Sequence, residues 1–337
     1  MCELRSAMPR AVYLLSPTWF DYIYGPDERA ALAQRVDIAP SLLTEEMYRA
    51  LEGRWPEVEF IFSGWGMPRA DADFLDRFPR LRAIFYGAGS IKDFATEEMW
   101  NRGIRVTSAA QANAVPVAEF ALSQILFSLK NGWQQVFFIR SHRRYPPRCQ
   151  PPGAWGSTVG LISLGMIGQL VAERLRSFDL RVIAYDPIVS PSVAQRLNVE
   201  LVALEDIFSR SDVVSCHTPH LPETEKMIGK KHFNLMKFNA TFINTARGAV
   251  VNEPELIEAL RDRPDLMAVL DVTSPEPPPE GSPIYSMENI LLTPHIAGSL
   301  GLECRRMGHS MIQELDRFLA GEPLLHEIKR QSITQRA

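Results

Sequence analysis

A short glycine-containing turn is the first segment whose residue types suggest a chemistry. Residues 163–168 read Ser-Leu-Gly-Met-Ile-Gly, so two of the three glycines of a GxGxxG turn are present, Gly165 and Gly168. In such a turn the second glycine lets the backbone approach a pyrophosphate, and the third lets the helix pack closely on the preceding strand. Ser163 replaces the first glycine, so its backbone must avoid strongly positive φ or accept a modest strain. The pattern is also compatible with an ordinary turn between a strand and a helix.

An acidic residue ends the next apolar run. Asp186 follows Leu180–Tyr185 and lies 21 residues after Gly165. A carboxylate at this place can accept hydrogen bonds from both hydroxyls of an adenosine ribose, and it would repel a 2′-phosphate. No Lys or Arg follows before Arg196, so no neighbouring cation would compensate that phosphate. The sequence therefore predicts NAD rather than NADP as the cofactor; the alternative is an aspartate at an exposed strand end.

Length and composition narrow the classes of protein. The chain has 337 residues, which suggests about two domains. Hydrophobic residues make up 46% of it, enough for a sizeable core in each domain. With 36 basic and 40 acidic residues the formal net charge is −4, which argues against a protein that coats nucleic acid or an anionic membrane surface. No apolar run approaches the length of about 18 residues that a membrane-spanning helix needs.

The cysteines and the first residues indicate the compartment. Cys2, Cys149, Cys216 and Cys304 form no CxxC pair, so a structural zinc site is not expected, and a chain of this length needs no disulfide framework. The first five residues lack the apolar stretch of a signal peptide. We therefore expect a cytoplasmic protein without a bound metal.

Short apolar runs alternate with helical patterns, as in βαβ units around a parallel sheet. A first group of strands is expected at residues 11–16, 59–62, 81–86 and 104–107, with helices at 27–35 and 44–51. A second group of six fits a doubly wound dinucleotide-binding sheet, at residues 158–164, 180–185, 212–216, 240–244, 266–271 and 289–293. Between the groups, Pro116 introduces a mostly apolar helix at Val117–Lys130, which is either a core helix or an interface helix.

Four segments of the chain together carry a family resemblance. They are the glycine turn with Asp186, residues 212–228, residues 236–271 with Asn-Thr-Ala-Arg-Gly at 244–248, and Glu276-Pro277 followed by Thr-Pro-His-Ile-Ala-Gly at 293–298. In this order and spacing, which covers most of residues 113–300, the chain resembles the D-isomer-specific 2-hydroxyacid dehydrogenase family. That family includes phosphoglycerate dehydrogenases and glyoxylate–hydroxypyruvate reductases.

The resemblance implies an α/β fold of two Rossmann-like parallel-sheet domains, one flavodoxin-like and one doubly wound, with a cleft between them. The substrate-binding domain would be discontinuous and consist of residues 1–113 plus 299–337, because the helical pattern at Leu302–Leu319 crosses back to it. Residues 114–298 would form the NAD-binding Rossmann domain. The resemblance also implies a homodimer.

Three catalytic residues follow from the same resemblance: Arg247, Glu276 and His295. Reduction of a 2-oxo acid adds a hydride to the carbonyl carbon and a proton to its oxygen. His295 would exchange that proton. Glu276 would hold the other imidazole nitrogen and stabilise the charged ring, while Arg247 would bind the substrate carboxylate and polarise the carbonyl. Taken singly, Arg247 could also be an ordinary loop residue, Glu276 a solvated side chain and His295 a residue that caps a strand end.

Further contacts to the cofactor are implied in the same way. Met166 and Ile167 match positions against the pyrophosphate, and Gly298 belongs to the wall beside His295. The adenosine end is matched by Pro219 and Thr224, and the nicotinamide end by Thr245 and Asp271, with Asp271 reaching the carboxamide. His217 matches a position near the cofactor, although a structural imidazole at a strand end is the simpler interpretation.

The substrate contacts are expected on a loop of the first domain. Gly87, Ala88 and Gly89 follow a strand, where the family binds the substrate carboxylate with backbone N–H groups. The next residues, 90–93, depart from the family pattern, so the substrate cannot be transferred from better-known members. Trp65, Tyr86 and Lys92 are candidates for a pocket wall or a second anionic contact; alternatively the two aromatics are core residues and the lysine is solvated.

These expectations lead to one function and one main alternative; a further alternative is a pseudo-enzyme in which Ser163 impairs cofactor binding. The first is an NAD-dependent D-2-hydroxyacid dehydrogenase that acts as a 2-oxo acid reductase, with a small-molecule substrate and without a nucleic-acid or membrane partner. The alternative is an NAD(H)-sensing protein that uses the same fold to bind partners, because such a protein can retain the acid–base residues. The absence of a long disordered tail weighs against this alternative.

Overall fold

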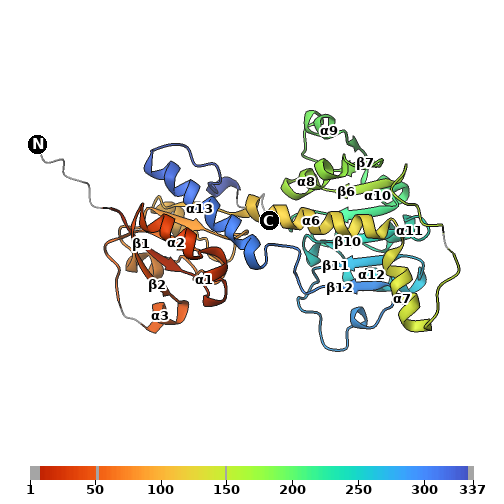
Figure 1. The fold of residues 1–337 in the computed structure, drawn as a ribbon, viewed down its shortest axis with the longest axis horizontal. Helices are drawn as coiled ribbons and strands as arrows, with labels where there is room; N and C mark the ends of the chain where they lie inside the picture. Colours follow the sequence, from red (N-terminus) through yellow and green to blue (C-terminus); the bar gives the residue numbers. More distant parts are fainter. Residues whose placement is uncertain (1–7, 51–52, 149, 333–337) are drawn as a thin grey trace, which may run out of the picture. The chain divides into compact units, whose positions relative to one another are not determined.

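The chain divides into two compact units in a computed structural model that describes residues 8–50, 53–148 and 150–332. One unit is Met1–Asn113 together with Ser299–Ala337, and the other is Ala114–Gly298. Each unit contains one parallel sheet covered by helices (Figure 1). The expected α/β class with two parallel sheets is confirmed. Cys2, Cys149 and the first five residues, which entered the expectation about the compartment, lie outside the described residues.

The sheet of the first unit has five parallel strands in the order β2-β1-β3-β4-β5, which is the flavodoxin-like order. The strands are β1 (Arg10–Leu14), β2 (Asp37–Leu43), β3 (Val58–Ser63), β4 (Ala83–Tyr86) and β5 (Arg105–Ser108). The helices are α1 (Pro17–Ile23), α2 (Pro26–Ala33), α3 (Glu45–Ala50), α4 (Ala72–Arg77), α5 (Glu97–Asn101) and α13 (Cys304–Leu319). The C-terminal helix α13 thus joins the N-terminal strands, beside α1 and α2 (Figure 1).

Alternation along the central strands divides the core of this unit into two layers. Phe60 and Phe62 of β3 pack on one face of the sheet with Met307 and Met311 of α13. Ile61, between them in sequence, packs on the other face with the apolar residues of α4 and α5. Because successive side chains of a strand point to opposite faces, an apolar run buried on both sides is what a parallel sheet requires. The loops at the carboxyl ends of β1, β3 and β4 are therefore fixed by a rigid support.

Strand β2 is absent from the expectations. Its residues are mostly exposed and include Pro40, so the run lacks the apolar pattern of a central strand. It lies at the edge of the sheet and pairs only with β1, where a residue without a backbone N–H is tolerated. The two-residue edge strand β8 (Glu200–Leu201), whose residues are both exposed, was missed for the same reason.

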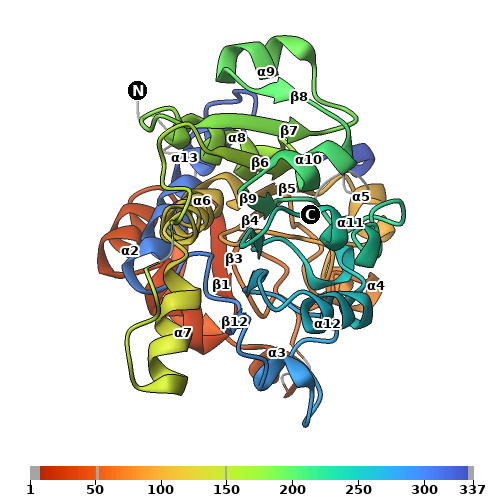
Figure 2. The same cartoon turned by 90° about the vertical axis from the view of Figure 1, so that its right-hand side faces the viewer.

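The second unit contains a seven-stranded parallel sheet in the order β12-β11-β10-β9-β6-β7-β8. Its other strands are β6 (Thr158–Ile162), β7 (Arg181–Tyr185), β9 (Val213–Cys216), β10 (Thr241–Asn244), β11 (Met267–Leu270) and β12 (Ile290–Leu292). Its helices are α7 (Gly132–His142), α8 (Met166–Leu175), α9 (Pro191–Leu197), α10 (Leu204–Arg210), α11 (Lys230–Leu235) and α12 (Glu253–Asp262), with 3₁₀ turns η1 (Gly248–Val250) and η2 (Pro283–Tyr285). From β6 the strands are added first towards β8 and then, starting with β9, towards β12; β6 and β9 are neighbours in the sheet (Figure 2). Doubly wound sheets bind ligands at the carboxyl ends of the strands beside such a switch point.

Helix α6 (Ala110–Ser128) begins before Pro116, so the expectation that Pro116 introduces the helix was wrong. Three alanines and polar residues precede the proline and form a helical turn of their own, and Pro116 lies buried inside the helix. Ala118, Ala121 and Ile125 pack against the second sheet, which supports the interpretation as a core helix. No single helix of the described residues is long and apolar enough to cross a membrane; α6 and α7 meet that limit only as a pair, bent by 65°.

Candidate active site

The side chains predicted to carry the chemistry of the second unit arise at one edge of its sheet. Because the strands are parallel, their carboxyl ends meet there. The residues that follow these ends are Gly165 after β6, Asp186 after β7, His217 after β9, Arg247 after β10, Asp271 and Glu276 after β11, and His295 after β12. Positions far apart in the sequence are thereby brought to neighbouring loops.

His295 and Glu276 form the clearest pair at this edge. The imidazole Nδ1 lies 2.7 Å from the Glu276 Oε1, and the two side chains are 48% and 41% exposed. A carboxylate at Nδ1 favours the tautomer in which Nδ1 donates, which leaves Nε2 for exchange with a ligand. Among the described residues, Nε2 has no hydrogen-bond partner. This arrangement can give and take a proton at Nε2.

The loop that carries His295 is held by a buried aspartate. Asp271, 1% exposed, accepts hydrogen bonds at Oδ1 from Thr293 Oγ1 (2.6 Å) and from the Ile296 N–H (2.8 Å). Its Oδ2 accepts one from the Ala297 N–H at 2.8 Å. His295 itself has a φ of 54°, in the left-handed region that non-glycine residues adopt at a cost. Asp271 therefore supports a backbone shape that His295 does not favour. The sequence analysis assigned neither this contact nor a role for Thr293.

Arg247 lies on a turn that is fixed from two sides. Asn244 donates from Nδ2 to the Arg247 carbonyl, and its Oδ1 accepts from the Ala246 N–H. Gly248 packs directly on the next loop, since a Cβ there would lie 2.0 Å from the Thr273 carbonyl carbon. Arg247 is half-buried and donates from Nη1 to the Ala246 carbonyl. The guanidinium is thus presented by a rigid turn beside the loop that leads to Glu276.

Glu253 supports the Glu276 loop from α12, although the sequence analysis did not single it out. Its Oε2 accepts a hydrogen bond from the Ser274 N–H at 3.0 Å. Burial raises the pKa of the Glu253 carboxyl above its usual range. A glutamate at the first position of a helix is common for electrostatic reasons, so the residue type does not predict the contact with the Ser274 N–H.

The glycine turn has the shape of a dinucleotide-binding turn. A Cβ at Gly168 would lie 2.1 Å from the Ser163 carbonyl oxygen, so only glycine allows α8 to approach β6. Gly165 precedes α8, and no side chain caps the helix. A Cβ at Gly165 would meet only Ser163 Oγ, at 4.0 Å, so this side of the turn is open. Ser163 has a φ of 77°, and of the two alternatives for this residue the strained one is correct.

Asp186 is bound to the glycine turn by several donors. Its Oδ2 accepts from the Leu164 N–H at 2.8 Å and from Ser163 Oγ at 3.2 Å. Its Oδ1 accepts from the N–H groups of Ile188 and Val189 at 2.8 and 2.9 Å. Asp186 is half-buried rather than exposed. The carboxylate therefore has a defined orientation at the end of β7.

Two buried polar atoms at this edge lack a partner within the described part of the chain, Thr245 Oγ1 and His217 Nδ1. His217 Nε2 lies 3.0 Å from Ser215 Oγ, and burial lowers the pKa of the His217 imidazole to about 4. Thr224 acts within its own loop, because its hydroxyl donates to the Pro219 carbonyl at 2.6 Å and accepts from the Leu221 N–H. Met166 and Gly298 lie at the surface of the same edge.

In the first unit, Gly87, Ala88 and Gly89 follow β4. The Gly87 N–H donates to the Ser63 carbonyl at 2.8 Å, and Ser108 Oγ donates to the carbonyls of Ala88 and Gly89. A Cβ at Gly87 would lie within 3.1 Å of three neighbouring atoms, so a larger residue does not fit. The loop is thus rigid.

The other candidates near this loop have different surroundings. Tyr86 belongs to the core, as the simpler interpretation has it. Trp65 is half-buried and packs on Trp19, with ring centroids 4.7 Å apart.

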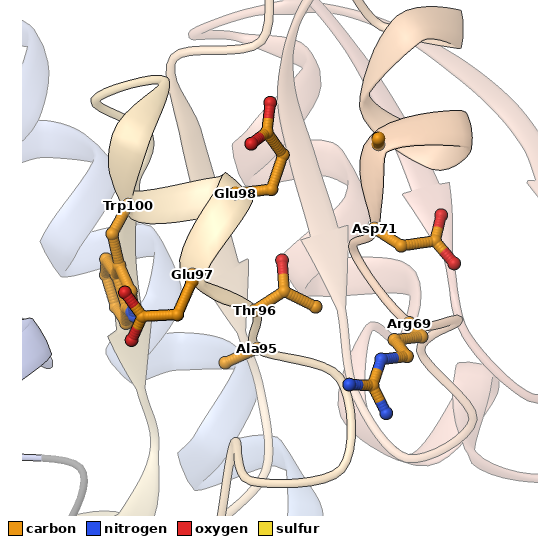
Figure 3. Close-up of a pocket in the computed structure, with 8 residues that line it drawn as sticks. Arg69, Asp71, Ala95, Thr96, Glu97, Glu98 and Trp100 are labelled. Carbon is orange, nitrogen blue, oxygen red and sulfur yellow. The ribbon is translucent and has the colours of Figure 1, made fainter.

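A shallow hollow of the first unit is lined by other residues (Figure 3). Asp71 caps α4 through the Phe74 N–H, Glu97 pairs with Arg330, and Glu98 pairs with Arg102. The acidic groups of the hollow thus serve helix ends and ion pairs. None of the predicted site residues lines it. Within the residues that the structure describes, no group of three His, Cys, Asp or Glu side chains could hold a metal ion.

Comparison with known proteins identifies the family. Residues 124–297 match the model of the D-isomer specific 2-hydroxyacid dehydrogenase, NAD binding domain. The chain belongs to the D-isomer-specific 2-hydroxyacid dehydrogenase family. It is 31% identical to the glyoxylate reductase of Korarchaeum cryptofilum over 256 residues. This match covers 75% of this chain and 77% of that enzyme.

Two further likenesses extend the comparison. The chain is 29% identical over 301 residues to the D-3-phosphoglycerate dehydrogenase of Methanocaldococcus jannaschii, covering 89% of this chain and 56% of that enzyme. It spans about half the length of the first phosphoglycerate dehydrogenases that it matches. The NAD-complexed D-isomer specific 2-hydroxyacid dehydrogenase of Lactobacillus delbrueckii ssp. bulgaricus has the same fold, with a TM-score of 0.77 over 95% of this chain and 100% of that one at 22% identity.

The residues of the second unit fit NAD, the cofactor of this family's domain. The glycine turn leaves an open side at Gly165, where a pyrophosphate can approach the uncapped first turn of α8. Asp186 presents an oriented carboxylate at the end of β7, and Thr245 Oγ1 is a buried polar atom without a partner among the described residues. Polar atoms buried in this way are ordinarily satisfied by a ligand or water.

Proposed function

We propose that this chain is an NAD-dependent D-2-hydroxyacid dehydrogenase that reduces a small 2-oxo acid, with His295 as acid and base. The contact of 2.7 Å between His295 Nδ1 and Glu276 Oε1, on the NAD-binding unit, carries the proposal. Bound NADH supplies the hydride for the carbonyl carbon. His295 Nε2 gives the proton to the carbonyl oxygen, and in the reverse reaction it removes the proton from the hydroxyl.

Glu276 and Arg247 complete the proposed chemistry. The Glu276 carboxylate accepts a hydrogen bond from His295 Nδ1, which orients the ring for proton transfer at Nε2. Arg247 binds the substrate carboxylate and polarises the carbonyl, because its guanidinium is a planar cation with several donors. The Gly87 N–H already donates to the Ser63 carbonyl, so on the loop of the first unit we propose the N–H groups of Ala88 and Gly89 for binding of a substrate carboxylate. The rigidity of both loops supports these roles.

We assign the cofactor contacts as follows. The start of α8 would hold the pyrophosphate, and Asp186 would hold the adenosine ribose. The remaining contacts are proposed for Gly165, Met166, Ile167 and Gly168 at the pyrophosphate, Pro219 and Thr224 at the adenosine end, and Thr245, Asp271 and Gly298 at the nicotinamide end. For Asp271, the three donors already on its carboxylate make a supporting role for the His295 loop the stronger one.

The proposal is tested by NADH oxidation with glyoxylate, hydroxypyruvate, pyruvate and phosphohydroxypyruvate, and with NADPH in parallel. We expect turnover with at least one of these acids, faster with NADH than with NADPH. Binding of NADH without turnover of any 2-oxo acid, together with a change of oligomeric state, would favour the NAD(H)-sensing alternative instead.

We further propose a cytoplasmic homodimer. The buried thiols of Cys216 and Cys304 are free, which suits a reducing compartment. The partly exposed apolar residues of α6 and α7, Phe127 and Ile139, support a subunit contact on these helices. Sedimentation of the purified protein at micromolar concentration tests the dimer: a species of about 76 kDa is expected from a 38.0 kDa chain, and a monomer contradicts it.

A further inference from the structure

Ser163 is a strained residue at a place where the turn calls for glycine. Its φ is 77°, in the left-handed region that glycine adopts freely and serine does not. Among the described non-glycine residues with positive φ, three are asparagines, Asn131, Asn198 and Asn239, the type that tolerates this conformation best. A serine held in this conformation within a binding turn suggests that its side chain has a use there.

The hydroxyl of Ser163 borders the open side of the turn. Ser163 Oγ lies 3.2 Å from Asp186 Oδ2. Apart from the residues adjacent to Gly165 in the chain, Ser163 Oγ is also the one described atom that a Cβ at Gly165 would meet, at 4.0 Å. The hydroxyl thus lies between the carboxylate that would face the ribose and the glycine that would face the pyrophosphate.

We propose that Ser163 is a cofactor-binding residue whose hydroxyl forms a hydrogen bond with an adenosine-ribose hydroxyl of NAD(H), jointly with Asp186. A carboxylate has about four acceptor sites, and four protein donors already point to Asp186. Three of these donors are backbone N–H groups, which are fixed. The fourth is Ser163 Oγ, which keeps its own lone pairs; no described residue donates to them, so they can accept a hydrogen bond from a ribose hydroxyl.

The bond from Ser163 Oγ to Asp186 Oδ2 is kept when the ribose binds and orients the hydroxyl. The hydrogen bond between Ser163 Oγ and the ribose hydroxyl is therefore a net gain of one bond. This inference rests on the proposed binding of NAD, and it adds a residue that the glycine pattern would have excluded.

Two variants separate the hydroxyl from the strain. Ser163→Ala removes the hydroxyl and keeps the strained backbone, whereas Ser163→Gly removes both. NADH binding by fluorescence titration and the Tm of the cofactor-free protein are the readouts. We expect both variants to bind NADH about three- to tenfold more weakly, the range of one hydrogen bond. The Tm of Ser163→Gly should exceed that of Ser163→Ala. Asn198→Gly, which changes another left-handed residue of the same unit, should leave NADH binding unchanged.

Deoxy analogues locate the contact. Removal of the 2′- or 3′-hydroxyl of the adenosine ribose from NADH should weaken binding to the wild-type protein more than to Ser163→Ala, for one of the two hydroxyls. If Ser163→Gly binds NADH as tightly as the wild type, or if both analogues lose affinity equally for the two proteins, the inference is wrong. If the wild type binds no NADH, the cofactor assignment fails first and this inference falls with it.

Discussion

Two residues at the carboxyl edge of the second sheet share a left-handed backbone conformation, and the aspartates that support them differ in burial. Ser163 and His295 both have positive φ, 77° and 54°. In each case an aspartate accepts a hydrogen bond from the N–H of the following residue, Asp186 from Leu164 and Asp271 from Ile296. The two loops therefore use the same device, a carboxylate at the end of a neighbouring strand that holds a strained residue.

The difference lies in what each carboxylate can still do. Asp271 is fully buried, and its donors belong to the loop of residues 293–297. Each carboxylate accepts from one hydroxyl, Thr293 Oγ1 or Ser163 Oγ, but Asp186 is half-buried, so water or a ligand can reach it. Removing the hydrogen-bond partners of a buried carboxylate costs more free energy than removing those of a carboxylate that water can reach. The comparison thus supports the proposed positioning role of Asp271 and the proposed ligand-binding role of Asp186.

The largest expected effect concerns His295 itself. Replacement by alanine or glycine removes the proposed proton donor and should lower kcat by about 10²- to 10⁴-fold. Glycine adopts a φ of 54° without strain, so the Tm of His295→Gly should exceed that of His295→Ala. Steady-state NADH oxidation and thermal unfolding measure the two effects. An unchanged kcat would exclude His295 as acid and base, and equal Tm values would show that its backbone is not strained.

Asp271→Asn should have the next largest effect, on both stability and turnover. The amide retains one acceptor oxygen and places an NH₂ group against a backbone N–H, so about 2–3 kcal/mol of unfolding free energy should be lost. The His295 loop should then lose its defined shape, and kcat should fall. Urea unfolding and NADH oxidation test this. A variant with wild-type stability would show that Asp271 does not support the loop.

Local patterns of the sequence predicted the frame of this edge, whereas Arg247, Glu276 and His295 were predicted from the family resemblance. The glycine turn, Asp186 at the next strand end and the apolar runs of the second sheet all follow from short patterns with a direct physical meaning. The exposed edge strands β2 and β8 were missed, since an edge strand needs no apolar pattern. Helix α6 was predicted to begin too late, because a proline such as Pro116 more often begins a helix than lies within one.

The contacts of the site could not be predicted in the same way. Asp271 and the N–H groups of Ile296 and Ala297 are 25 and 26 residues apart and meet only because β11 and β12 are neighbours in the sheet. The choice between a relaxed and a strained Ser163 likewise depends on the tertiary structure, which holds Leu164 against Asp186. Sequence patterns identify such residues but do not show which of their atoms are already in use.

The buried imidazole of His217, next to the glycine turn, predicts that the stability of the protein depends on pH. Its side chain lies 3.9 Å from the place of a Cβ at Gly168, and burial lowers the pKa of its imidazole from 6.5 to about 4. Between these pKa values the unfolded chain binds a proton that the folded protein does not, so stability falls as the pH falls through this window. The expected loss is about 2 kcal/mol between pH 7 and pH 5.

The variant His217→Gln isolates this contribution, because glutamine has no proton to gain. Urea unfolding at pH 7 and pH 5 should show a smaller loss for the variant than for the wild type. Equal losses in both proteins would mean that the imidazole accepts a proton in the folded state, and hence that water reaches the space beneath the glycine turn.

Asp186→Asn gives the smallest effect and the sharpest test of the comparison. An amide keeps one acceptor oxygen and can still hold part of the turn, and water can reach the site, so the Tm should change little. The Kd for NADH should rise about tenfold, and the preference for NADH over NADPH should decrease because the charge that repels a 2′-phosphate is gone. Fluorescence titration with both cofactors measures this. If Asp186→Asn is destabilised as strongly as Asp271→Asn while its NADH affinity is unchanged, then both carboxylates serve only the backbone, and the difference between the two loops disappears.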